Sequence, residues 1–268
     1  MKSSGVITFT TDFGLADPYV GVMKGVVLSI NPAAQMIDIS HFVKAGAITQ
    51  AAFLIREAYP FFPQGTVHVV VVDPGVGGRR RPILIETQDH IFVGPDNGVF
   101  STIVSDHKQA VAFHITESRY FLPDVSNTFH GRDIFAPVAA HISRGVEPLE
   151  MGPVISDPVT FEIPVAEERG TVLYGRIMHI DGFGNLISNV KEAELGAFLG
   201  AERPFIIVGK LMIEGLRKSY SEVGAGEVLA LIGSSGCLEI AVNQGRACDI
   251  AGTGRDGLIG KTVEVRRD

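Results

Sequence analysis

The sequence predicts an N-terminal α/β domain, built on an open, mainly parallel sheet with helices on both faces, and a small all-β C-terminal domain. Over the first half of the chain, strand-like and helix-like segments alternate, which is typical of β-α-β units. After about residue 146 the segments become short, β-rich and punctuated by glycine. That pattern favours a barrel or sandwich of roughly 100 residues. We expect domains at 1–150 and 170–268, joined by a linker over 151–169.

The elements of the first domain follow from apolar periodicity and from turn residues. A helix is expected over 17–30, with Asp17 as N-cap and Pro18 at the first helical position. A second helix over 47–59 ends at Pro60. The other predicted elements are strands at 6–10, 35–40, 66–72, 82–87, 90–94 and 110–115, and helices near 99–105 and 132–145.

The segment between the two domains is rich in proline. Four prolines fall between residues 146 and 170, which is typical of an interdomain connection. Beyond it, the strands and the one helix are short. The strands are predicted at 171–180, 185–190, 204–209, 227–233, 237–242 and 261–266, and the helix at 191–200.

Composition excludes several classes of protein. The net charge of −7 and a basic cluster of only three arginines (79–81) argue against a nucleic-acid partner. Cys237 and Cys248 are the only cysteines, too few for a disulfide framework or a structural zinc site. No secretory signal stands at the N-terminus, and no apolar run reaches the ~18 residues that span a membrane. We therefore expect a soluble, cytoplasmic protein without a membrane partner.

Acidic and basic residues gather where an open α/β sheet binds its ligands. Such ligands lie beyond the carboxyl ends of the strands. Asp12 follows the first predicted strand and Asp73 the third. The motif "TFHGRD" places His130, Arg132 and Asp133 at the start of the last helix of the domain. The order of elements therefore brings an acid, a base and a cation to one edge of the sheet.

Each of these residues taken alone also has a plain structural interpretation. An aspartate at a strand end is often a turn residue, and Asp133 is typical of a helix N-cap. His130 alone is typical of a structural histidine, and the arginines of a solvated loop. The glycine-rich stretches "GTGRDG" (252–257) and "GLIGKT" (257–262) lack the context of phosphate-binding loops and are interpreted as turns. "PDNG" (95–98) predicts a turn before a helix.

Several motifs occur in a fixed order over nearly the whole chain: "TFTTDFG", "VVDPGVG", "GPDNG", "FHGRD", "IDGFGN" and "GSSGCLEIAVN". As a set they resemble the S-adenosylmethionine hydroxide adenosyltransferase family, which is related to the fluorinase and chlorinase. The resemblance implies a Rossmann-like N-terminal domain and a C-terminal β-barrel. It also implies homotrimers, with each site between the N-terminal domain of one subunit and the C-terminal domain of the next.

The implied reaction is hydrolysis of S-adenosyl-L-methionine to adenosine and L-methionine, by water or hydroxide at C5′. The resemblance implies that no metal or other cofactor takes part, and that Asp73, Arg80 and His130 position and activate the water. Water is a poor nucleophile whose pKa a metal ion usually lowers. Arg80 can instead stabilise developing hydroxide through charge-assisted hydrogen bonds. Whether Asp73 or His130 accepts the proton stays open.

Substrate contacts are also implied, and they come from both domains. Asp12 corresponds to the aspartate that holds the ribose diol, where one carboxylate accepts from two hydroxyl groups. The other implied contacts are Asp17 and Asp181 near the methionine ammonium, Ser234 and Ser235 at its carboxylate, and Asn185 and Asn243 around the adenine.

Departures from the fluorinase favour a hydrolase. The fluorinase has tyrosine in place of Asp73, Tyr-Ser in place of His130-Gly131, an aromatic residue in place of Ile187, and a long insertion where residues 87–89 connect two strands here. A halide would meet the unfavourable charge of Asp73.

Three alternatives remain. The chain could be a halide adenosyltransferase. It could be a metal-dependent hydrolase that uses Asp12, Asp73 and His130 as ligands. It could also be a sensor that binds S-adenosylmethionine or nucleosides and retains only vestigial activity.

Overall fold

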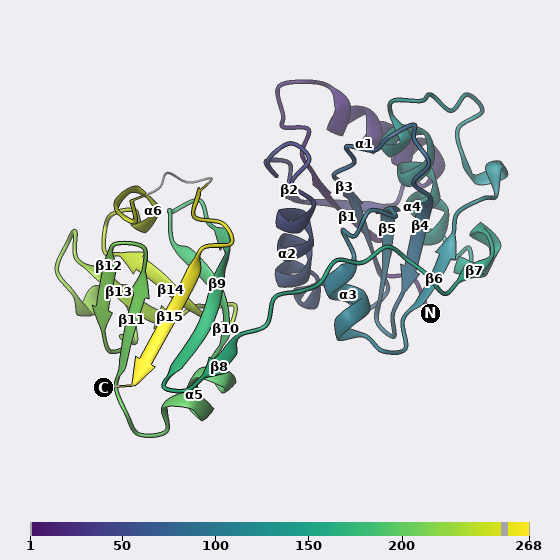
Figure 1. Cartoon of the computed structure of the whole chain (residues 1–268). Coiled ribbons are helices and arrows are strands. Elements are labelled where there is room, and N and C mark those ends of the chain that lie inside the picture. Colours follow the sequence, from purple (N-terminus) through teal and green to yellow (C-terminus); the bar gives the residue numbers. More distant parts are fainter. Residues whose placement is uncertain (1, 253–256, 268) are drawn as a thin grey trace. The chain divides into compact units, whose positions relative to one another are not determined.

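The chain folds into two compact units, Met1–Glu162 and Ile163–Asp268. The computed structural model describes residues 2–252 and 257–267 (Figure 1). The division between the units falls inside the segment 151–169, and the predicted bounds of the domains and linker stay predictions. Each unit has its own hydrophobic core. Among the described residues, no helix combines the length and apolar character that crossing a membrane requires.

The N-terminal unit is built on a seven-stranded sheet of order β2-β1-β3-β5-β4-β6-β7. The pairs β1–β2, β1–β3 and β3–β5 are parallel, and β4–β5, β4–β6 and β6–β7 are antiparallel. Its strands are β1 (Val6–Thr11), β2 (Gln35–Ser40), β3 (Thr66–Val71), β4 (Pro82–Glu86), β5 (His90–Pro95), β6 (Val111–His114) and β7 (Val154–Ile155).

The sheet is therefore mixed, and the expectation of a mainly parallel sheet was wrong. The cause is the short connection between β4 and β5, residues 87–89. A parallel pair needs a crossover of a dozen residues or more, whereas a loop this short closes only an antiparallel hairpin. The parallel half of the sheet, β2-β1-β3-β5, carries the strand ends where the acidic residues were predicted.

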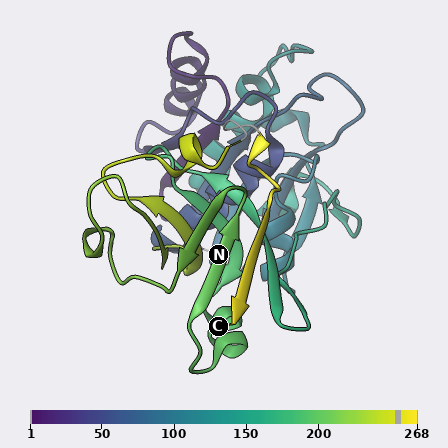
Figure 2. The ribbon, with the colours of Figure 1, turned by 60° about the vertical axis from the view of Figure 1, so that its left-hand side comes forward.

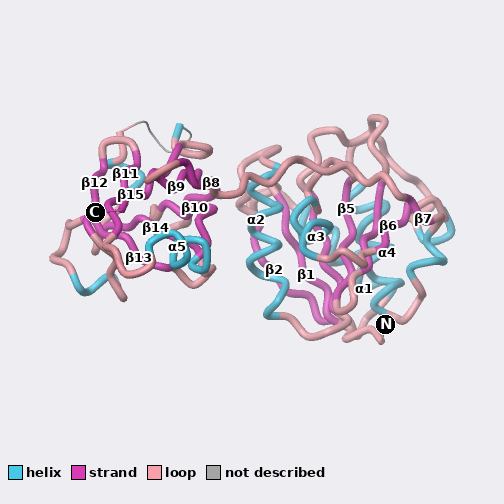
Figure 3. The backbone as a smooth tube through the Cα atoms, turned by 60° about the horizontal axis from the view of Figure 1, so that its bottom comes forward, coloured by secondary structure: helices cyan, strands magenta, loops and turns pink. Residues whose placement is uncertain are grey.

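Helices cover both faces of this sheet (Figure 3). Met23 and Val27 of the first helix pack with Val69 and Val71 of β3, while Ile55 packs on the opposite face with a separate set of residues. The predicted helices on both faces are confirmed. The helices are α1 (Tyr19–Ile30), α2 (Ile48–Ala58), α3 (Ser101–Asp106) and α4 (Ala136–Ser143), with a π-helical turn at Gly131–Phe135 and 3₁₀ turns at Tyr59–Phe61, Ser118–Tyr120 and Pro148–Met151.

The two predicted helix caps were wrong. Helix α1 begins at Tyr19, and Pro18 occupies the cap position without any side-chain cap hydrogen bond. Asp17 thus lies one residue too early for its carboxylate to reach a free N–H of the first turn. Asp133 lies inside the π-helical turn rather than at its start, and it is fully buried.

The C-terminal unit is one antiparallel sheet of order β12-β11-β15-β9-β10-β14-β13, with β8 paired to β9. Arg217, after β12, forms a bridge with Leu231 of β13, so the two ends of the sheet meet and the sheet is nearly closed. Its elements are β8 (Glu167–Arg169), β9 (Val172–Ile180), β10 (Leu186–Lys191), α5 (Glu192–Leu199), β11 (Pro204–Val208), β12 (Leu211–Glu214), a 3₁₀ turn at Tyr220–Glu222, β13 (Val228–Ile232), β14 (Cys237–Val242), α6 (Ala247–Ile250) and β15 (Thr262–Arg267).

A barrel-like sheet is therefore present in residues 163–268, as the glycine-punctuated strands predicted. In Figure 2 the yellow arrow is β15, with green strands of the same sheet beside it. The stretch "GLIGKT" contains a turn in which Gly260 has φ +79°, which agrees with its interpretation as a turn from the sequence. Most of "GTGRDG" lies outside the described residues.

A buried histidine pair lies in the middle of the N-terminal sheet. His68 of β3 is fully buried, with Nδ1 2.8 Å from Thr8 Oγ1 and Nε2 3.2 Å from His90 Nδ1. Its ring stacks on Phe92 at 5.0 Å between centroids. Burial, and next the neighbouring His90, lower the pKa of His68 to about 3, and burial lowers the pKa of His90 as well.

This pair predicts acid sensitivity of the N-terminal unit. Below pH 6.5 an unfolded histidine binds a proton that folded His68 refuses down to about pH 3. The free energy of unfolding therefore decreases as the pH is lowered through that window, by up to about 1.4 kcal/mol per pH unit for each such group. Hydrogen exchange of the β3 amides at pH 7 and pH 5, corrected for intrinsic rates, measures the fall. His68→Gln should lessen it, and an equal fall in both proteins would contradict the prediction.

Candidate active site

The loop after β3 folds back so that Arg80 faces Asp73. Two turns achieve this, with Val76 N–H donating to Asp73 O at 3.2 Å and Gly78 N–H to Gly75 O at 3.0 Å. Gly77 has φ +74°, and a Cβ added there would collide with the backbone oxygen of Asn127. Glycine is required at this position because the loop packs directly against the segment that leads to His130.

Asp73 and Arg80 form a buried ion pair. Arg80 Nε donates to Asp73 Oδ1 at 3.0 Å and to Oδ2 at 2.9 Å, and Nη2 also donates to Oδ2. Their side chains are only 5% and 9% exposed, so the two charges neutralise each other away from water. The guanidinium lies over the Phe135 ring, 5.4 Å from its centroid. These contacts fix the orientation of Arg80.

Arg80 also determines the protonation of His130. Its Nη2 lies 2.7 Å from His130 Nδ1. A guanidinium donates hydrogen bonds and accepts none, so Nδ1 must carry a lone pair, and the neutral ring holds its proton on Nε2. Burial, and next the charge of Arg80, lower the pKa of His130 below the usual 6.5. At neutral pH His130 is therefore an uncharged ring with an Nε2–H donor.

A cavity of about 450 Å³ lies beside this cluster, lined by Asp73, His130 and Asp12. Apolar residues form much of the remaining wall, including Phe13 and Phe129, whose rings contact edge-to-face at 5.8 Å. Asp12 follows β1, Asp73 follows β3, and His130 precedes the π-helical turn. Three distant segments thus place polar side chains in one largely apolar cavity, which is the usual composition of a small-molecule site.

Only one of the three consecutive arginines belongs to this cluster. Arg79 is exposed. Arg81 pairs with buried Asp96 at 2.6 Å and with Asp157 at 2.9 Å. The Asp96 carboxylate in turn accepts the N–H of Val159, so Arg81 fastens the segment around residue 158 to the N-terminal unit.

Other residues predicted near the site have structural surroundings. Asp17 is exposed and does not line the cavity. Asp133 accepts the N–H of Ser126 at 2.8 Å and pairs with Arg132. Burial, which raises the pKa of Asp133, is outweighed by these hydrogen bonds, which lower it. The buried charge of Asp133 therefore anchors the loop before His130. Asn97 Nδ2 donates to Val72 O at 2.9 Å, which agrees with its interpretation as a turn residue.

The predicted residues of the C-terminal unit lie in three separate turns. Asn185 donates to Asp181 through its backbone N–H at 2.8 Å and its side-chain amide at 3.0 Å, within the loop between β9 and β10. Ser234 and Ser235 form the turn between β13 and β14. Asn243 Nδ2 donates to Val223 O at 2.8 Å, so this amide group holds a neighbouring loop.

A second cavity of about 450 Å³ lies in this unit, and among the predicted residues only Asn185 lines it. No motif of the sequence points to Tyr220, whose hydroxyl donates to the buried Glu239 at 2.7 Å. The backbone of Gln244 adopts φ +54°, which no spacing in the sequence predicts. The remaining lining residues are Phe183, Val242, Gly245 and Arg246.

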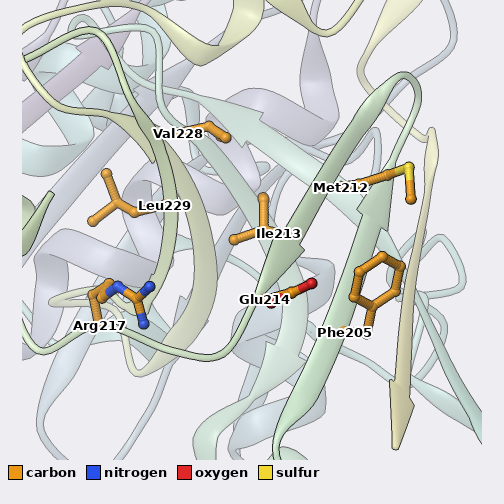
Figure 4. Close-up of a pocket in the computed structure, with 7 residues that line it drawn as sticks. All are labelled: Phe205, Met212, Ile213, Glu214, Arg217, Val228 and Leu229. Atoms are coloured by element: carbon orange, nitrogen blue, oxygen red, sulfur yellow. The ribbon is translucent and has the colours of Figure 1, made fainter. Parts of the chain in front are cut away.

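A third pocket, of about 340 Å³, lies where the two ends of the barrel-like sheet meet. Phe205 and Met212 lie on one side of it and Arg217 and Leu229 on the other (Figure 4). None of the residues predicted to contact substrate lines it. Across residues 2–252 and 257–267, no three His, Cys, Asp or Glu side chains gather in a group that could hold a metal ion.

Fold and site together define a two-domain protein with a buried aspartate–arginine–histidine cluster beside a small-molecule cavity. The chain belongs to the S-adenosylmethionine hydroxide adenosyltransferase family, because models of the N- and C-terminal domains of that family match residues 7–152 and 175–258.

Named relatives and a solved structure cover nearly the whole chain. A Salinispora tropica protein named (R)-S-adenosyl-L-methionine hydrolase is 35% identical over 92% of this chain and 93% of its own. A fluorinase from Actinoplanes sp. is 26% identical over 89% of this chain and 91% of its own. The crystal structure of an uncharacterized conserved protein from Thermotoga maritima is similar, with a TM-score of 0.91 and 34% identity. It covers 97% of this chain and 100% of its own.

The cluster predicts how the pKa of His130 responds to the arginines. Arg80→Met removes the cation that helps to lower this pKa, so the value should rise, whereas Arg79→Met, which removes an exposed arginine, should leave it unchanged. Titration of the His130 imidazole by NMR measures both. A pKa that does not respond to Arg80→Met would contradict the contact between the guanidinium and Nδ1.

Proposed function

We propose that this protein hydrolyses S-adenosyl-L-methionine to adenosine and L-methionine by attack of water at C5′. Membership of the family and the names of the hydrolase relatives support the substrate. The observation that carries the proposal is the Asp73–Arg80–His130 cluster beside a cavity that Asp12 also lines. In the name of these relatives, "L" specifies the configuration of the α-carbon of methionine. The prefix "(R)" therefore specifies the configuration of the sulfonium sulfur. We propose the same epimer as substrate here.

In this mechanism the cluster holds one water molecule behind C5′. The Nε2–H of His130 donates to the water oxygen, because the lone pair of the ring, on Nδ1, already faces Arg80. Neutral His130 is therefore an orienting donor, and the proton of the water passes to Asp73. A strong base is unnecessary, since water bonded to C5′ becomes a far stronger acid than free water. Asp73 can serve even though Arg80 stabilises its charge.

The bond changes balance without another reactant. The O–C5′ bond forms, the C5′–S bond breaks, and its electron pair goes to sulfur. The sulfonium leaves as the neutral thioether of methionine, so the leaving group needs no acid. What remains for the protein is to align oxygen, C5′ and sulfur, and alignment alone contributes several orders of magnitude in rate. A halide in place of the water would meet the carboxylate of Asp73, which favours hydrolysis over halide transfer.

The remaining substrate contacts are proposed from the family resemblance. Asp12 offers Oδ1 to the ribose hydroxyls, because its Oδ2 already accepts the Gly46 N–H at 2.8 Å. The other proposed contacts are Asp17 and Asp181 to the methionine ammonium, Ser234 and Ser235 to its carboxylate, and Asn185 and Asn243 to the adenine. Asn243 would have to use Oδ1, since its Nδ2 donates to Val223.

Assembly, fold type and location are part of the same proposal. We propose a homotrimer in the cytoplasm, with each site completed by the N-terminal unit of one subunit and the C-terminal unit of the next. The N-terminal sheet is assigned to the Rossmann-like class, and no cofactor takes part. Support comes from the family resemblance and from the distribution of the proposed contact residues over both units. Light scattering during size-exclusion chromatography tests the trimer, and a monomer that turns over substrate would exclude shared sites.

Incubation of the protein with the separate (R) and (S) epimers in H₂¹⁸O tests the reaction. We expect the (R) epimer to give methionine and adenosine, with ¹⁸O in the 5′-hydroxyl. Asp73→Asn and His130→Ala should each slow kcat about 100-fold or more, while Arg79→Met should match the wild type. The products are separated by chromatography, and their masses are measured by mass spectrometry.

The alternatives give different results in the same assay. A 5′-chloro product in added chloride would indicate a halide adenosyltransferase. Loss of activity on chelation, restored by a metal, would indicate a metal-dependent hydrolase. Tight binding of the substrate without turnover would indicate a sensor.

The state of His130 also predicts the acid side of the pH–rate profile. Protonation at Nδ1 would place a second cation against Arg80 and break their hydrogen bond, so activity should fall as the pH drops through the pKa of His130. Because burial and Arg80 lower this pKa, the midpoint of the fall in kcat/KM should lie below 6.5. A midpoint at or above 6.5 would contradict this role.

A further inference from the structure

His41 anchors the backbone on both sides of Asp12. It directly follows β2, it is buried, and its Nδ1 lies 2.9 Å from the hydroxyl of Thr11, the residue before Asp12. Its backbone oxygen accepts the N–H of Gly14, two residues after Asp12, at 2.7 Å. His41, at the end of the neighbouring strand, thus contacts both sides of the turn that places the Asp12 carboxylate in the cavity.

Further hydrogen bonds complete this turn. The Thr11 hydroxyl accepts the N–H of Phe13 at 3.3 Å, and Thr11 O accepts the N–H of Val43, also at 3.3 Å. The Asp12 Oδ2 accepts the Gly46 N–H, and within the described part of the chain Oδ1 has no hydrogen-bond partner. The backbone around Asp12 is therefore fixed, and one carboxylate oxygen is left for a ligand.

An acidic partner lies beside Nε2 of the His41 ring and favours one of its two neutral tautomers. Nε2 lies 3.0 Å from Asp38 Oδ1, an ion-pair distance without the geometry of an aligned hydrogen bond. Asp38 Oδ2 pairs with Lys24 at 2.6 Å. Burial raises the pKa of Asp38, but its contacts with Lys24 and His41 outweigh burial and lower it. The carboxylate beside Nε2 favours the ring proton there, so Nδ1 accepts the proton of the Thr11 hydroxyl.

We propose that His41 is a positioning residue that sets the specificity for ribose. It does not line the cavity and acts only through Asp12, by holding Oδ1 where both hydroxyls of a ribose 2′,3′-diol can donate to it. One carboxylate oxygen meets two hydroxyl groups only in a narrow range of positions, so a small displacement of the turn weakens this recognition. This inference rests on the proposed function, because it takes an adenosyl group as the ligand.

The test compares kcat/KM for (R)-S-adenosyl-L-methionine and for its 2′-deoxy analogue of the same sulfonium configuration. The wild type should prefer the ribose substrate. His41→Ala should reduce that preference about tenfold or more, the usual value of a hydrogen bond to a charged group. Most of the change should fall in KM, since Asp73, Arg80 and His130 are untouched. His41→Asn keeps an acceptor near the Nδ1 position and should restore part of the preference. Thr11→Val removes the other partner of the bond and should act like His41→Ala.

The chain offers a matched control in His68. This histidine is also buried, and its Nδ1 also bonds a threonine of β1. Its contacts are with Thr8, with His90 and with the rings of Tyr59, Phe62 and Phe92, rather than with the turn around Asp12. His68→Ala should lower Tm as His41→Ala does and leave the preference for ribose at the wild-type value.

Three results would overturn the inference. One is an unchanged preference in both His41→Ala and Thr11→Val, which would leave His41 a structural residue only. Should His41→Ala fail to fold, Thr11→Val and His41→Asn decide the same question. Another is a wild type that turns over both substrates equally. A wild type that turns over neither would overturn the proposed function itself, and the inference with it.

Discussion

The buried ion pair between Asp73 and Arg80 is the contact on which the site depends. It neutralises the only two formal charges of the cluster, and the same guanidinium donates to His130 at 2.7 Å. Because breaking a buried pair leaves an unpaired charge, the loop after β3 and the turn before Phe135 are held together as one structure. The pair also bears on the proposed chemistry: it makes His130 a neutral donor, and in the proposed mechanism Asp73 accepts the proton of the water.

Backbone geometry makes this contact possible. Gly77 allows the loop after β3 to touch the backbone of Asn127, and a Cβ at Gly131 would crowd Met23, Phe129 and Val71. The π-helical turn that begins at Gly131 widens the helix where His130 enters the cavity, and such turns are frequent at functional sites. Two glycines and the π-helical turn thus support the ion pair, because they allow the backbone segments to pack closely, and they take no part in the chemistry.

The sequence predicted the two units and most of the strands, because these depend on apolar runs, but it missed the short strands β7, β8 and β12. Its motifs pointed to Asp73, Arg80 and His130, whose side chains are in contact in the structure and whose catalytic roles stay predictions. The mixed sheet follows from the short connection at residues 87–89, whose length already required an antiparallel pair. The prediction also failed where contacts rather than spacing decide: Asp17 lies one residue before the cap of α1, and Asp133 anchors a loop. Tyr220 and His41 carried no signal, since Tyr220 lies in a polar stretch and His41 acts through a threonine distant in sequence.

The tautomer of His130 tests the central claim most directly, because it follows only if Arg80 donates to Nδ1. Nitrogen-15 chemical shifts of the imidazole at neutral pH distinguish the two neutral tautomers and the imidazolium. We predict an unprotonated Nδ1 and a protonated Nε2. A proton on Nδ1, in either the neutral or the charged ring, would contradict the arrangement of the cluster and the division of roles between His130 and Asp73.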